Sequence, residues 1–217
     1  FDSKGNLYVA DGNNRRVRKI EFVSPNVFDL QPRMPMQSIP LLTNNLTFQF
    51  VRQSNGNSVP WRLADTNVLE VIPGTGSIVT TQEFTSFRLH AEFRTPTNGQ
   101  NGNSGIFLQG RYEVQIFNSF GKSVLDANDC GAIWGQTPPP TNVCLAPGEW
   151  QTYDIVFRAP RFDDSGTVQV PAALTVLHNG VLVQNHFDLK GATAWHKPPS
   201  YSVHADKLPL QIQFHGN

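Results

Sequence analysis

The chain has 217 residues, of which 17 are lysine or arginine and 17 are aspartate or glutamate, so its formal net charge is zero. This balance argues against a nucleic-acid partner, because binding to phosphates relies on an excess of positive charge. No run of apolar residues approaches the roughly 18 that a membrane-spanning helix needs, and a hydrophobic content of 39% is typical of a globular protein.

The first predicted element is a β-hairpin close to the N-terminus. Leu7–Ala10 and Val17–Phe22 are typical of strands and flank a turn at residues 11–14. The order Gly-Asn-Leu-Tyr-Val-Ala-Asp, followed by Asn, Arg, Val, Arg and Lys, resembles an NHL repeat, which is one blade of a β-propeller. Because a lone blade cannot bury its faces, residues 1–24 are expected to belong to a propeller upstream in a longer protein; a chance hairpin is the alternative.

An extended linker is predicted over residues 25–40. This segment contains four prolines, and proline removes a backbone donor and blocks regular structure. A second, larger domain is then expected over residues 41–217.

Period-two alternation predicts a series of strands in the larger domain. The clearest are Phe84–Thr95, Tyr112–Asn118, Trp150–Arg158, Ala172–His178, Val181–Asn185 and Leu208–His215. Asn179-Gly180 is the strongest short hairpin signal, and no amphipathic helix longer than two turns is evident. Many alternating strands with turn-rich connections indicate an all-β fold, either a two-sheet sandwich or a jelly roll.

Several of these strands have one apolar face and one face of large hydrogen-bonding side chains. The polar set is His90, Glu92, Arg94, Glu113, Gln115, Gln211, Gln213 and His215. If the strands are neighbours, these side chains cover one sheet surface with donors, acceptors and carboxylates. Such groups suit sugar hydroxyls, so a carbohydrate is the expected partner; an ordinary solvated sheet face is the alternative.

A set of segments, in chain order, resembles one family. They are Gly74–Ile78, Phe87–Arg94, Gly102–Gln115, Cys130–Ile133, Pro147–Asp154, Val176–Val181 and His215–Asn217. The family is the 3-keto-disaccharide hydrolase domain, and the resemblance covers about residues 61–217. It implies the concanavalin A-like lectin/glucanase fold, a jelly roll of two curved antiparallel sheets. That fold carries lectins, glucanases and structural modules, so the fold alone does not define an activity.

The resemblance implies cleavage of a 3-keto glycoside by elimination. The keto group acidifies the hydrogen at C2, a base removes it, and the enolate expels the glycosidic oxygen from C1. Glu113 or His215 is then the base or a metal ligand, and Arg94 stabilises the enolate. A divalent metal that polarises the carbonyl is also implied, although the sequence contains no metal motif of recognisable spacing. Five residues are expected to contact substrate: Asn103, Gln115, Glu92, Gln213 and Trp134.

Three positions depart from the family pattern. Asn118 and Phe214 stand where members commonly have an acidic residue, and Trp134 stands where they commonly have tyrosine. Losing two carboxylates removes acid/base or metal-ligand capacity but leaves hydrogen bonding and stacking to sugars. Catalysis is therefore uncertain, and two alternatives stay open: a noncatalytic, lectin-like carbohydrate-binding module, and a structural domain that self-assembles or adjoins the upstream propeller.

A conventional glucanase is disfavoured. Retaining glycosidases place two carboxylates about 5–5.5 Å apart, and glucanases of this fold place them at alternate positions of one strand. Here the outward positions of that strand are Glu113, Gln115 and Phe117, which provide a single carboxylate.

Both cysteines, Cys130 and Cys144, lie in a loop rich in proline and glycine, and relatives often carry the same pair. A disulfide between them would close a loop of about 15 residues and contribute roughly 3 kcal/mol. It would imply an oxidising compartment, so a secreted, periplasmic or cell-surface protein is expected. Two free thiols are the alternative.

Overall fold

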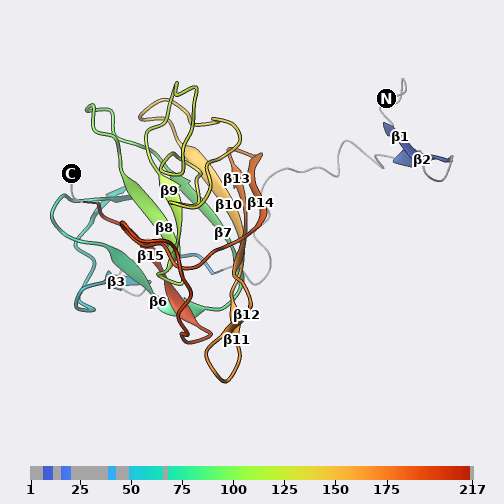
Figure 1. Ribbon diagram of the computed structural model, residues 1–217. Coiled ribbons are helices and arrows are strands. Elements are labelled where there is room, and N and C mark those ends of the chain that lie inside the picture. The colour runs from blue at the N-terminus through green and yellow to red at the C-terminus, as the bar shows by residue number, and fades with distance from the viewer. Residues whose placement is uncertain (1–6, 12–15, 21–38, 43–48, 66–67, 216–217) are drawn as a thin grey trace. The chain divides into compact units, whose positions relative to one another are not determined.

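A computed structural model describes residues 7–11, 16–20, 39–42, 49–65 and 68–215 (Figure 1). The chain divides into two units, Phe1–Pro40 and Leu41–Asn217. In the first unit, β1 (Leu7–Asp11) and β2 (Arg16–Ile20) pair antiparallel. The hairpin expected there is confirmed, whereas its membership of an NHL repeat stays a prediction. Residues 25–38 of the predicted linker lie outside the described residues.

Two antiparallel sheets make up the larger unit. The four-stranded sheet has the order β14-β13-β10-β7, formed by Val181–Asp188, Ala173–His178, Gln151–Arg158 and Phe87–Phe93. The five-stranded sheet has the order β3-β6-β15-β8-β9, formed by Phe50–Arg52, Ile78–Phe84, Leu208–Ile212, Ser104–Leu108 and Tyr112–Ile116. Two small hairpins accompany them: β4 (Arg62–Asp65) with β5 (Val68–Glu70), and β11 (Arg161–Phe162) with β12 (Val168–Val170).

The all-β jelly-roll fold expected from the sequence is confirmed. Helix is absent from the described part of the chain, which therefore contains no helix able to cross a membrane. The two large sheets pack face to face (Figure 1), and the main core lies between them. Leu108 and Val114 of one sheet and Leu174 of the other are fully buried there. Burying a side chain of this size contributes about 1.5–3 kcal/mol.

The hairpin predicted at Asn179-Gly180 is present between β13 and β14. Both residues have positive φ, +50° for Asn179 and +77° for Gly180. A two-residue turn with positive φ at both positions matches the twist of the strands it joins, and asparagine and glycine adopt it at the lowest cost. This turn places His178 opposite Val181 in the register.

Cys130 and Cys144 are free thiols, so the disulfide expected between them is not formed in the structure. Both residues are buried with polar contacts of their own. The sulfur of Cys130 lies 3.1 Å from the hydroxyl of Tyr153, and that of Cys144 lies 3.7 Å from the carbonyl oxygen of Phe117. The two thiols also hydrogen-bond each other, so the predicted partners lie side by side and their oxidation to a disulfide stays a prediction. The oxidising compartment, which rested on the disulfide, stays a prediction.

Candidate functional site

The five-stranded sheet carries a continuous row of side chains on its outer face, which is the face turned away from the main core. The strand register places them directly opposite one another in the order Val51, Val79, Gln211, Phe107 and Glu113. Directly opposed residues of antiparallel strands point to the same side. Their neighbours along the chain, such as Ile106 and Val114, belong to the core, so the row itself faces outward.

Residues 131–134 extend this row beyond β9. Ile133 forms a bridge with Val114, and the backbone N–H of Trp134 donates to the carbonyl oxygen of Glu113 at 3.2 Å. An antiparallel bridge at these two residues places Trp134 directly opposite Glu113. The indole of Trp134 is therefore the next side chain of the row, as its predicted role in substrate contact requires.

Glu113 is buried on the outer face, with 4% of its surface exposed. Its carboxyl group extends over Gly105 of the neighbouring strand, where a Cβ atom would collide with Oε1. Within the described residues this carboxyl has no hydrogen-bond or ion-pair partner, and burial alone raises the pKa of Glu113 to about 8. A carboxyl group with this pKa can exchange protons near neutral pH, which is what an acid or base catalyst needs.

The raised pKa predicts how stability depends on pH. The folded protein keeps the proton of Glu113 up to about pH 8, whereas an unfolded chain releases it above roughly pH 4.3. The free energy of unfolding therefore falls as pH rises between these values, by about 1.4 kcal/mol for each unit of pKa difference. Glu113→Gln removes this loss, so the variant should be more thermostable than wild type above pH 5, by a margin that grows up to pH 8.

Thermal unfolding of both proteins at pH 5, 6, 7, 8 and 9 tests this expectation. A difference in Tm that stays constant across the series would show that Glu113 titrates at its ordinary pKa in the folded protein.

Amide groups form a second row beside Glu113. Gln115 is opposite Gly105 in the register, and the N–H of Gln213 donates to the carbonyl oxygen of Gly105 at 2.9 Å. The Nε2 atom of Gln115 donates to Asn103 Oδ1 at 3.3 Å, which brings this predicted contact residue to the same place. The Oε1 atoms of Gln115 and Gln213 are buried with no partner in the described structure. An unpaired buried acceptor costs about 1–3 kcal/mol, so a ligand hydroxyl that donates to it would be favoured.

The single polar surface predicted from strand alternation is wrong, because β7 belongs to the other sheet. Its partner is β10, so Arg94 and Glu92 are separated from Glu113 by the fold. The guanidinium of Arg94 lies 5.0 Å from the ring centroid of Trp150. Glu92 lies beside His90, whose Nδ1 is 2.7 Å from Asp154 Oδ1. Neither Arg94 nor Glu92 has a recorded contact with Glu113 in the described structure, so their roles toward a substrate stay predictions.

His215 stays with the sheet of Glu113. It is exposed and follows the end of β15. Phe214 packs against the small core cluster around Trp61, so Gln213 and His215 on either side of it project outward. Phe214, which stands where the family commonly has an acidic residue, therefore packs against the core. Asn118, the second position where the family commonly has an acidic residue, accepts a hydrogen bond from the N–H of Phe120 at 3.3 Å and stabilises a turn.

The residues around Glu113 do not fit a divalent metal. Nowhere in the described ranges do three His, Cys, Asp or Glu side chains gather in a way that could hold an ion. Glu113 is the one carboxylate of its row, and its neighbours are amide and aromatic side chains. Calcium takes six to eight oxygen ligands, and magnesium requires a near-ideal octahedron. No step of the reaction is therefore assigned to a metal.

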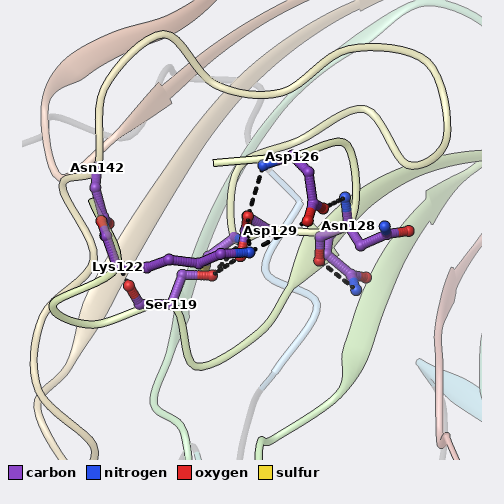
Figure 2. A network of polar contacts seen from close by, with 8 residues as sticks. Ser119, Lys122, Asp126, Asn128, Asp129 and Asn142 are labelled. Atoms are coloured by element: carbon purple, nitrogen blue, oxygen red, sulfur yellow. Dashed lines mark hydrogen bonds and ion pairs between the residues drawn. The ribbon is translucent and has the colours of Figure 1, made fainter. Parts of the chain in front are cut away.

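A buried carboxylate anchors the long connection between β9 and β10 (Figure 2). Asp129, 1% exposed along its side chain, accepts hydrogen bonds from Ser119 Oγ at 2.8 Å, Lys122 Nζ at 2.6 Å and the N–H of Asp126 at 2.7 Å. The adjacent Asn128 carbonyl accepts the Nε2 hydrogen of Gln115 at 3.1 Å. The network therefore supports the connection at the point where it touches the outer face.

Asp129→Asn should destabilise the protein. Charged hydrogen bonds contribute about 1.5–3 kcal/mol, and a chain of this size loses about 2–4 °C of Tm per kcal/mol. We expect a fall in Tm of about 4–10 °C by calorimetry. Asp126→Asn is the matched control, because Asp126 is exposed and its ion pair with Lys122 is worth under about 1 kcal/mol. Equal losses in the two variants would contradict the role given to Asp129.

Sequence reasoning missed several residues of the site. Phe107 and Gly105 alternate with the core residues Ile106 and Leu108 of β8, so a period-two pattern could have placed them outward. Thr193, whose Oγ1 accepts the N–H of Glu113 at 3.1 Å, lies in an irregular loop. No local sequence pattern predicts the contact of Thr193 with Glu113, because the two residues are 80 positions apart.

Comparison with known proteins places this architecture among carbohydrate-related domains. The 3-keto-alpha-glucoside-1,2-lyase-like domain family matches residues 45–217. A solved structure from Parabacteroides distasonis, provisionally assigned as a glycosyl hydrolase, has 36% sequence identity and a TM-score of 0.77, covering 84% of this chain and 78% of that one. A second structure from that organism, with the same provisional assignment, has 19% identity and a TM-score of 0.55 over 79% of this chain and 83% of its own, a likeness of fold alone. None of the curated proteins compared matches the chain.

Proposed function

This chain belongs to the 3-keto-alpha-glucoside-1,2-lyase-like domain family, and on that premise we propose that it binds a 3-keto glycoside on the outer face and cleaves it with Glu113. The observation that carries the proposal is the Glu113 carboxyl: buried, without a protein partner in the described structure, and with a pKa of about 8. Structural carboxylates are normally paired. An unpaired one beside unsatisfied amide oxygens supports a role toward a substrate.

The proposed reaction is an elimination followed by the addition of water. The ionised Glu113 removes the hydrogen at C2, the enolate forms at C3, and the bond between C1 and the glycosidic oxygen breaks. The leaving oxygen takes a proton from water, and hydroxide adds to C1 of the enone. Glu113 returns its proton to C2, so the net reaction is hydrolysis and the carboxylate is regenerated.

Side-chain amides are the hydrogen-bond donors that the outer face offers to the enolate. The Nε2 group of Gln115 already donates to Asn103 and to the Asn128 carbonyl oxygen, so Gln213, which lies beside Gly105, is the donor proposed for the enolate. Asparagine or glutamine amides stabilise oxyanions in other active sites. The arginine expected for this task follows β7 of the other sheet, and the pKa of Glu113 carries no contribution from a nearby cation. An uncharged donor set would also keep the Glu113 pKa high, which suits a base that acts near neutral pH.

Incubation with 4-nitrophenyl 3-keto-glucoside and with the unoxidised glucoside tests the proposal. Release of nitrophenol from the keto compound alone is the expected result, because only the keto group acidifies C2. No release from either compound, with sugar binding retained in calorimetry, would identify a noncatalytic binding module. The row around Glu113 contains a single carboxylate, and this observation favours the noncatalytic binding module as the second candidate function.

A further inference from the structure

A pair of stacked tryptophans lies beside Glu113. The ring centroids of Trp134 and Trp195 are 5.6 Å apart, and the planes are inclined by 27°. Trp134 is half-buried as the next member of the row, whereas Trp195 is 68% exposed. Together the two indoles offer an apolar surface of the kind on which a flat ligand ring stacks.

The loop that carries Trp195 is tied down on both sides. Ala192 donates from its N–H to the carbonyl oxygen of Ser200 at 3.0 Å, which closes residues 192–200 into a loop. The N–H of Thr193 donates to the carbonyl oxygen of Arg111 at 2.8 Å, and its hydroxyl accepts the N–H of Glu113. The loop that presents Trp195 is thus bonded to the backbone of the proposed catalytic residue through the Thr193 hydroxyl, and to that of Arg111 through the Thr193 N–H.

The ring of Trp195 is also oriented by its neighbour. His196 has φ of +56°, a conformation that non-glycine residues seldom adopt, and its ring lies edge-on to the indole at 4.3 Å between centroids. With Trp134 stacked against one side, the indole is held in place while much of its surface stays exposed. Such preorganisation lowers the entropic cost of binding a flat partner.

Glu113 separates two chemically different parts of the outer face. Amide groups of Gln115, Gln211 and Gln213 lie on its own sheet, whereas Trp134 and Trp195 lie past the edge strand. Amides match the hydroxyls of the oxidised sugar. Indole faces match a flat ring with an apolar side, either the C–H face of a pyranose or an aryl ring.

We propose that Trp134 and Trp195 form the subsite for the leaving group and select glycosides whose leaving group presents a flat ring face. The proposal rests on the proposed function in placing the scissile bond at Glu113. The oxidised sugar occupies the amide side, and the group attached through the glycosidic oxygen stacks on the tryptophan pair. A leaving group without a ring gains nothing from this surface.

Three 3-keto-glucosides test the subsite. Their leaving groups carry an aryl ring (4-nitrophenyl), a sugar ring (glucosyl) or no ring (methyl). Trp195→Ala should raise KM about tenfold more for the ring-bearing substrates than for the methyl compound, because stacking and burial together are worth about 1.4 kcal/mol. A large effect on the nitrophenyl compound alone would assign the subsite to aryl groups, and an effect on both ring compounds would include sugars. Equal changes in KM for all three substrates would overturn the proposal.

A binding measurement separates this inference from the proposed reaction. Calorimetric titration of Glu113→Gln with the unreactive 4-nitrophenyl glucoside needs no turnover. We expect the Kd to rise about tenfold when Trp195→Ala is added. Trp150→Ala is the matched control, since Trp150 is 44% exposed but lies beside Arg94, next to the four-stranded sheet. An unchanged Kd with Trp195→Ala would overturn the subsite even if the keto substrate is cleaved.

Discussion

Replacing Glu113 by glutamine should lower kcat for cleavage of a 3-keto glycoside by roughly 10²–10⁴-fold, the range that a lost general base typically causes. Glutamine keeps the shape and hydrogen-bonding capacity of the side chain but cannot accept the C2 proton. Because Glu113 is buried and unpaired among the described residues, the substitution should not disturb packing. The Kd for the unoxidised glucoside should therefore stay within a few-fold of wild type.

The dependence of kcat/KM on pH gives a second measure of the same residue. A base with a pKa of about 8 is ionised in only about one molecule in ten at pH 7, so wild-type activity should rise through pH 7 and level off above about pH 8. Residual activity of Glu113→Gln should lack this rise. Glu92→Gln is the matched control on the other sheet and should keep the wild-type rate and profile. A comparable loss in both variants would refute the assignment of the base.

Gly105→Ala should reduce kcat by about 100-fold. The three atoms closest to an added Cβ all belong to the Glu113 side chain, and its carboxyl oxygen is the nearest of them. Glu113 must move by roughly 1 Å to make room, and a displacement of this size can cost about two orders of magnitude in rate. Release of nitrophenol from the keto substrate measures the effect, and a rate near that of wild type would exclude close approach of Glu113 to Gly105.

Stability measurements identify the origin of the Gly105→Ala effect. In the wild-type background we expect about 1–3 kcal/mol of destabilisation from overpacking. In the Glu113→Ala background the side chain that would clash with the new Cβ atom is absent. Because Gly105 does not have a left-handed backbone conformation, alanine at this position should then be neutral or stabilise the protein by less than about 1 kcal/mol. A double-mutant cycle from urea unfolding yields the difference. Equal costs in both backgrounds would place the clash in the backbone.

Local patterning predicted much of the fold and some of the site. In β9 the alternation correctly assigned Tyr112, Val114 and Ile116 to the core and Glu113 and Gln115 to the opposite face. The hairpin at 179–180 was also recognisable, because only a few residue types adopt positive φ cheaply. These features depend on residues a few positions apart, so they can be predicted without knowledge of the remaining chain.

The all-β class, the family motifs and the outward position of Glu113 could be predicted from the amino-acid sequence alone, because they depend on local patterns. The neighbours of each strand follow from the folded chain alone: β7, which leads into Arg94, pairs in a different sheet from β9, which carries Glu113. The fold also places Gly105 beneath the carboxyl group of Glu113, Trp134 next to Glu113 in the row, and Trp195 in a stack with Trp134. Alternation defines the two faces of one strand, whereas strand pairing, burial and a shifted pKa arise from residues distant in sequence that fold into contact.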